Sequence, residues 1–148
     1  MIYAHTQQAP AGLRIAVLAL LVLVVAATAL TGNWLGLAIS LLAAAIVVGA
    51  MVIFSRLTIE LTETSIQARF GWGWPRRTIT WDEVNSIKLV RNSWWYGFGL
   101  RWFPGGTLWN VWGLEAVEFD LVKGSKFRIG TDEPDVLLAA MMGRVAIG

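Results

Sequence analysis

The chain has 148 residues, a net charge of +2 and a hydrophobic content of 56%. It contains no cysteine and one histidine, His5, so it has no disulfide and too few ligands for a transition-metal site. We therefore expect neither a metal nor another cofactor, and a length of this size suits one folded domain with appendages.

No charged residue occurs between Arg14 and Arg56. A bilayer core is about 30 Å thick and requires roughly 20 apolar residues per helix, so this stretch is long enough for two crossings. The sequence TGNWLG, residues 31–36, predicts the turn between them and puts Trp34 at the headgroup level. We expect a transmembrane helical hairpin over residues 14–54, preceded by a polar tail over residues 1–13.

Two other structures are compatible with an uncharged stretch. A buried helical hairpin of a soluble protein would need more surrounding protein than this chain supplies. A cleaved signal peptide ending near ATA, residues 27–29, leaves the second apolar span unexplained. The sequence therefore favours a hairpin that is retained in the mature protein.

The basic residues predict the orientation of this hairpin. One Lys or Arg precedes the first span, none lies in the turn, and the other eleven of the twelve follow the second span. Positively charged residues favour the cytoplasmic side of a membrane. We expect a multi-pass protein of the inner, cytoplasmic membrane with both termini in the cytoplasm.

Residues 55–148 are expected to form a cytoplasmic domain that is mostly β-structure. Apolar and polar residues alternate in LTIEL, SIQARF, RRTITW and AVEFDL, and the turn sequences PGG and KGS separate later segments. Short alternating segments with regular turns predict an antiparallel barrel or sandwich.

A change of period near the C-terminus predicts one amphipathic helix. The sequence TDEPDVLLAAMMGRV opens with Asp132 as a plausible N-cap, followed by acidic residues and a proline that suit a first helical turn. The side chains expected to pack inward are Val136, Leu137, Ala140 and Met141.

Two sequence segments resemble the bacterial pleckstrin-homology (PH) domain membrane proteins. They are LTETSIQARFGWGWPRRTITWDEVNSIKLV and FRIGTDEP, the latter running from Phe127 to Pro134, within a resemblance that covers residues 56–142. It implies a PH-like bent antiparallel sheet or barrel of about seven strands, capped by a C-terminal helix and anchored by N-terminal helices. It implies no enzymatic activity. Phosphoinositide-binding relatives use a basic loop between the first two strands, whereas this loop is TETS with Glu63, so inositide binding does not carry over.

Reactive side chains do not form a recognisable catalytic set. The carboxylate pair Asp82 and Glu83 lies in a predicted turn, and no nucleophile and base occur together. We therefore expect no enzyme activity, and no small-molecule substrate is identified. The predicted domain has a net charge near +1, which argues against a nucleic-acid partner.

The aromatic residues predict a contact surface. The stretch from Trp94 to Gly113 holds five tryptophans, of which Trp102 is expected in the core, as is Trp81 earlier in the chain. The first strand follows Phe54 without a linker, so alternate loops of the sheet should return to the membrane. The predicted membrane-interface residues are Trp34, Arg56, Trp72, Trp74, Arg76, Arg77, Trp94 and Trp95.

The function predicted from these features is non-catalytic. We expect a membrane-anchored PH-like domain that binds the lipid surface, a second copy of itself or a partner protein. The alternative is an accessory subunit of a membrane transport or secretion complex. Small residues in AISLLAAAIVVGA would suit packing against other helices, including those of a homo-oligomer.

Overall fold

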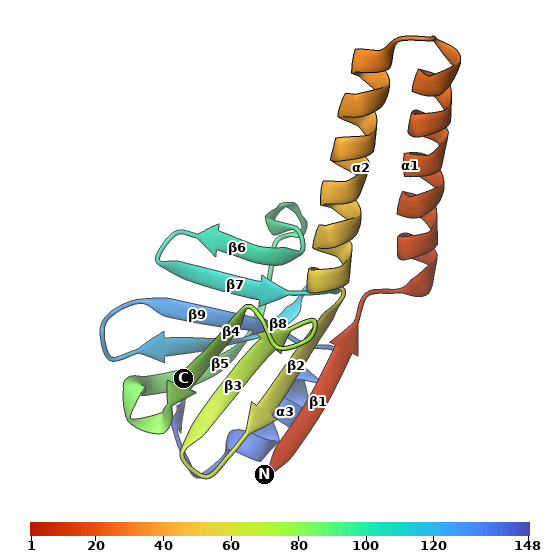
Figure 1. Ribbon diagram of the computed structural model, residues 1–148. Helices are drawn as coiled ribbons and strands as arrows, with labels where there is room; N and C mark the ends of the chain where they lie inside the picture. The colour runs from red at the N-terminus through yellow and green to blue at the C-terminus, as the bar shows by residue number, and fades with distance from the viewer.

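A helical hairpin projects from one end of a β-rich body in the computed structural model, which describes residues 1–148 (Figure 1). Helices α1 (Ala11–Leu30) and α2 (Trp34–Phe54) lie side by side. Both are long and apolar enough to cross a membrane, and neither is buried against the body. The turn is shorter than expected, because Trp34 already forms the first residue of α2.

Few polar side chains lie within the hairpin, and they form specific hydrogen bonds. The side chain of Asn33 caps α2 by accepting a hydrogen bond from the backbone N–H of Gly36 at 3.2 Å. The hydroxyls of Thr28 and Ser40 lie 2.8 Å apart and join α1 to α2. Each hydroxyl also lies 2.9 Å from a backbone carbonyl of its own helix, that of Val25 for Thr28 and that of Leu37 for Ser40.

The N-terminal segment is a strand, where a tail over residues 1–13 was predicted. Strand β1 (Tyr3–Gln8) pairs antiparallel with β2 (Arg56–Leu61) along its full length. Its Gln7 is 2% exposed and donates a hydrogen bond to the carbonyl of Trp112 at 2.9 Å. The edge of β2 presents unpaired backbone groups to the chain that precedes α1, and β1 satisfies them.

Ten strands form two sheets, and neither closes into the barrel of about seven strands that was one predicted form. One sheet has the order β1-β2-β3-β4, and the other has the order β10-β5-β8-β9-β7-β6. The sheets separate at the short helix η1 (Trp81–Glu83), which interrupts the chain between β4 and β5. The remaining strands are β3 (Ser65–Phe70), β4 (Arg76–Thr80), β5 (Val84–Arg91), β6 (Gly99–Phe103), β7 (Gly106–Asn110), β8 (Glu115–Leu121), β9 (Lys126–Gly130) and β10 (Ala146–Ile147).

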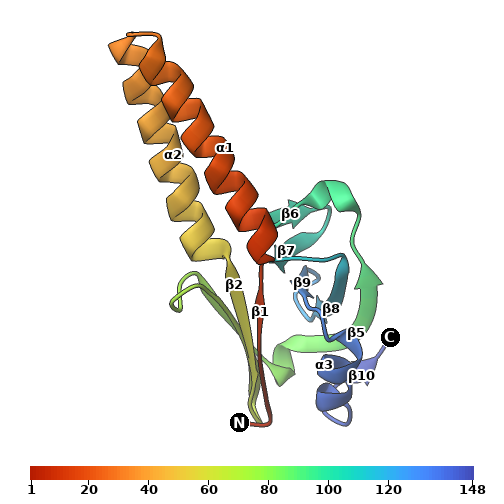
Figure 2. The same cartoon turned by 90° about the vertical axis from the view of Figure 1, so that its right-hand side faces the viewer.

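The core lies between the two sheets and is closed by α3 (Pro134–Met141). Alternation brings one face of each main strand inward, so that Ile59 and Phe119, for example, are fully buried. Helix α3 covers the end of the body opposite the hairpin (Figure 2). It buries Leu137 and Met141, whereas Val136, also predicted to pack inward, is exposed.

The junction between hairpin and body contains no linker. Helix α2 ends at Phe54 and β2 begins at Arg56, while the backbone N–H of Ala9 bonds to the carbonyl of Ser55 at 2.9 Å. The ring of Phe54 packs edge-on against Phe70, with 5.0 Å between ring centroids. The hairpin is thereby packed directly onto the core of the body.

Gly71 lets the β3–β4 loop approach the end of α2. It has a φ angle of +50°, and a Cβ there would lie 2.8 Å from the carbonyl oxygen of Ile53. We expect Gly71→Ala to destabilise the protein by about 1–3 kcal/mol beyond the conformational cost, because this backbone cannot yield easily. Thermal unfolding in detergent measures the loss.

The matched control for this variant is Gly124→Ala, since Gly124 has a φ angle of +83° and open space around its Cβ position. It retains the conformational cost but removes the clash. Equal losses of stability in the two variants would contradict a tight contact at the junction.

Candidate membrane-interface site

The β3–β4 loop carries two of the most exposed tryptophans of the protein. Trp72 is 91% exposed and Trp74 is 73% exposed. Both line a hollow together with Val52 and Ile53 from the last turn of α2. The loop therefore lies beside the end of the hairpin, at the level of Phe54.

The segment between β5 and β6 forms a second aromatic surface at this end. Its helix η2 (Trp94–Tyr96) exposes the rings of Trp94 and Trp95, which contact each other edge to face. Phe98 follows and lines a groove shared with α1 and α2. Both views show this segment at the hairpin end of the body, level with the last turns of α2 (Figures 1 and 2).

Trp34 lies at the opposite end of the hairpin and is 84% exposed. Helix α2 has 21 residues, so Trp34 at its start lies about 30 Å from its last turn, at 1.5 Å per residue. The other aromatic loops lie at the level of that last turn. This separation matches the thickness of a bilayer core. The chain therefore has two levels of exposed tryptophan at a spacing suited to two headgroup regions.

The eight predicted membrane-interface residues do not all come together. Arg56 and Arg76 are exposed at the hairpin end of the body. Arg77 instead points between the sheets, because it pairs in register with buried Ala68. Its guanidinium lies 4.4 Å from the ring centroid of Phe127, and burial lowers the pKa of Arg77. Arg77 is therefore a structural residue of the core edge.

Trp102 was predicted in the core but is 75% exposed. It lies on β6, an edge strand with little protein over one face. Trp109 takes a core position on neighbouring β7 and is 5% exposed.

Trp81 packs against the core as predicted, and its ring N–H donates to the carbonyl of Thr62 at 3.3 Å. Sequence analysis had not singled out Trp112, which stacks on Phe98 at 5.1 Å.

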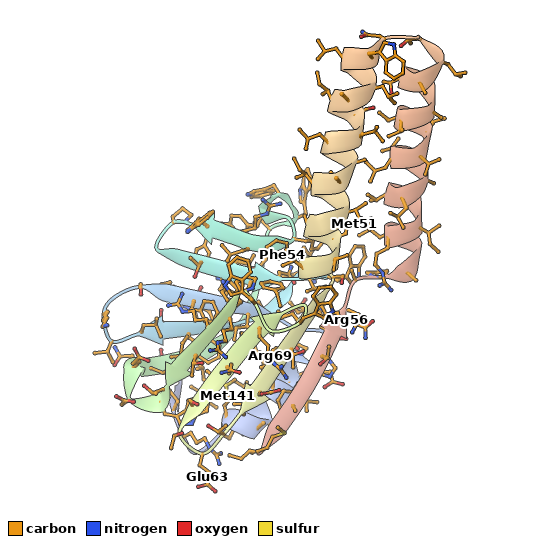
Figure 3. The ribbon with its side chains drawn as sticks, viewed as in Figure 1. Met51, Phe54, Arg56, Glu63, Arg69 and Met141 are labelled. Atoms are coloured by element: carbon orange, nitrogen blue, oxygen red, sulfur yellow. The ribbon has the colours of Figure 1, made fainter.

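The end of the body away from the hairpin has a different character. Figure 3 shows Glu63 at this far end, while Phe54 and Arg56 mark the junction. Here His5 lies in β1, with its Nε2 atom 2.7 Å from Asp132 and its Nδ1 atom 3.4 Å from Glu133. Burial and the charge of Glu133 raise the pKa of Tyr3 to about 12. This cluster joins β1 to the segment before α3.

The most buried charge of the protein is Glu118, which is 1% exposed on β8. Arg128 donates to its carboxylate at 2.5 Å, and the ammonium groups of Lys88 and Lys126 each lie 3.1 Å away. Burial alone would raise the pKa of Glu118, but these donors outweigh it and lower the pKa to about 2. Because three cations already neutralise this carboxylate, we interpret it as structural.

Comparison of the chain with protein-family models, with curated proteins and with solved structures found no match. The function is therefore inferred from the geometry and chemistry of this chain.

We expect the ion cluster of Glu118 to give the body an acid-sensitive stability. A carboxylate with a depressed pKa stabilises the folded state fully above its ordinary pKa of 4.5 and loses that contribution as the pH falls toward about 2. Glu118→Gln should remove this pH dependence and cost about 1–3 kcal/mol at neutral pH. Denaturant unfolding in detergent across this pH range measures both effects.

The control is Glu63→Gln, which removes an exposed carboxylate from the β2–β3 turn. It should leave the stability and its pH profile close to those of the unaltered chain. An identical pH profile with and without the Glu118 carboxylate would refute its role.

Proposed function

We propose that the protein is a non-catalytic membrane protein whose PH-like β domain lies against the bilayer and binds its surface. The observation that carries this proposal is the position of Trp72, Trp74, Trp94 and Trp95, exposed on loops at the hairpin end of the body. Tryptophan gains from a headgroup boundary, where its apolar body and polar N–H both find suitable surroundings. Two packed sheets with a C-terminal helix over one end support the PH-like assignment.

The membrane anchor in this proposal is the hairpin of α1 and α2. Its apolar surface faces outward, which suits lipid and not water. The pairing of β1 with β2 keeps both strands on the same side of the hairpin. With eleven of the twelve basic residues after α2, we assign that side to the cytoplasm and the hairpin to the inner membrane.

A cleaved signal sequence fits the structure less well than a retained anchor. Cleavage after α1 would remove β1 as well. The edge of β2 would then lose its backbone partners, and the buried side chain of Gln7 would leave its contact with the body. Retention of the hairpin preserves both.

The alternative function is that of an accessory subunit in a membrane complex or a homo-oligomer. Trp102 favours it, because this exposed ring lies on the free edge strand β6. An exposed edge and an exposed aromatic ring are features of protein contacts. In this case the aromatic loops would face a protein partner in place of lipid.

The topology makes a direct prediction. Reporter fusions at Met1 and at Gly148 should lie on the cytoplasmic side, and a reporter inserted at Asn33 should lie on the other side. The cause is the uncharged hairpin, with basic residues confined to one side. A reporter at Asn33 that shares the side of Gly148 would rule out two crossings.

Contact with lipid predicts selective fluorescence quenching. Brominated phospholipids should quench the tryptophan emission of the reconstituted chain, and Trp72→Phe with Trp74→Phe should lower the quenched fraction. The control Trp109→Phe removes a core ring, so it should leave the quenched signal unchanged. If the quenched fraction is the same with and without Trp72 and Trp74, their loop does not contact lipid and the protein-partner function gains support.

A further inference from the structure

A groove of about 530 Å³ separates the hairpin from β6. Its volume lies within the usual range for small-ligand sites. Ile46, Ala50 and Phe54 of α2 form one wall, and Phe98 and Leu100 form the facing wall. The groove is therefore a largely apolar channel beside the membrane helix.

Two arginines give this channel a positive charge. Arg14 comes from the first turn of α1, and Arg101 comes from β6. No acidic residue lines the groove, and neither arginine forms an ion pair. The Nε atom of Arg14 is buried without a hydrogen-bond partner. A buried donor of this kind is costly unless a ligand satisfies it.

The arrangement along the groove separates charge from apolar surface. Arg14 and Ser55 lie at the base of the two helices, whereas the apolar wall reaches up α2 as far as Ile46. From Phe54 to Ile46 is about 12 Å along the helix axis. The groove thus begins at the level of the aromatic loops and extends toward the centre of the proposed bilayer.

We propose that this groove binds one anionic glycerophospholipid, with its phosphate on Arg14 and Arg101 and an acyl chain along α2. This inference rests on the proposed seating of the domain at the membrane. Guanidinium groups offer forked donors that match phosphate oxygens, and the apolar wall requires a hydrocarbon partner. A free phosphate would satisfy the arginines but not the apolar wall, whereas a phospholipid satisfies both.

Native mass spectrometry of the full chain, released from nanodiscs of equal phosphatidylglycerol and phosphatidylcholine, tests the proposal. We expect the chain to retain one phosphatidylglycerol in preference to phosphatidylcholine. Arg14→Gln and Arg101→Gln should each lower this retention about fivefold, the effect of one arginine at an anionic leaflet. Ala50→Phe should block the groove and lower the retention of either lipid.

Two matched controls separate the groove from the general membrane surface. Arg76→Gln removes an exposed arginine at the same end of the body, and Ala45→Phe enlarges an exposed residue of α2 outside the groove. Both should keep the preference for phosphatidylglycerol over phosphatidylcholine, because neither residue lines the groove. Full retention without both Arg14 and Arg101, an equal loss in the Arg76 control, or no lipid preference in the unaltered chain would overturn the proposal.

Tryptophan quenching in the same nanodiscs, prepared with brominated lipids, keeps the two proposals distinct. Quenching that falls in Trp72→Phe with Trp74→Phe, without a preference for phosphatidylglycerol, would refute the groove and leave the membrane seat supported. Quenching that is the same with and without Trp72 and Trp74 would refute the membrane seat, and the lipid groove with it.

Discussion

The pairing of β1 with β2 determines how the rest of the molecule is arranged, because these strands continue directly into the two helices of the hairpin. Six residue pairs run from Tyr3 and Leu61 to Gln8 and Arg56, so both ends of the hairpin belong to one sheet. Neither helix can turn freely relative to the body. Packing of Phe54 on Phe70, and of Phe70 on Trp109 at 5.2 Å, extends this restraint into the core.

This restraint fixes which loops lie beside the hairpin, and the aromatic side chains are concentrated on those loops. A rigid junction brings the same loops to the hairpin end in every molecule, and these loops carry Trp72, Trp74, Trp94 and Trp95. The far end carries polar turns and the His5 cluster. A chain with few reactive groups can therefore function by the position of its binding residues. The exposed tryptophans of the aromatic loops and the two arginines of the groove all lie at the end of the body that we propose faces the bilayer.

Local sequence patterns predicted much of this structure, because the period of apolar residues along the chain depends on the type of secondary structure. The uncharged stretch predicted both long helices, and alternation such as Ile59, Glu60 and Leu61 predicted strands. The strand at residues 3–8 was missed because its partner lies beyond the entire hairpin. Trp102 and Arg77 were misplaced for a related reason: alternation predicts two faces of a strand, but only the tertiary arrangement decides which face is covered. The groove near Arg14 and Arg101 joins residues from α1, α2, the start of β6 and Val111, so no single motif could predict it.

The depth of the aromatic loops tests the central claim most directly. The chain has no cysteine, so single cysteines can be introduced at Trp74, Trp95, Glu63 and Lys123 and labelled with nitroxides without a prior background substitution. Electron paramagnetic resonance power saturation in liposomes then compares access of each label to oxygen and to a polar nickel complex. The account predicts that labels at positions 74 and 95 lie at the headgroup level, while those at 63 and 123 are fully in water. Labels that are all equally accessible to the polar complex would contradict a domain seated on the membrane.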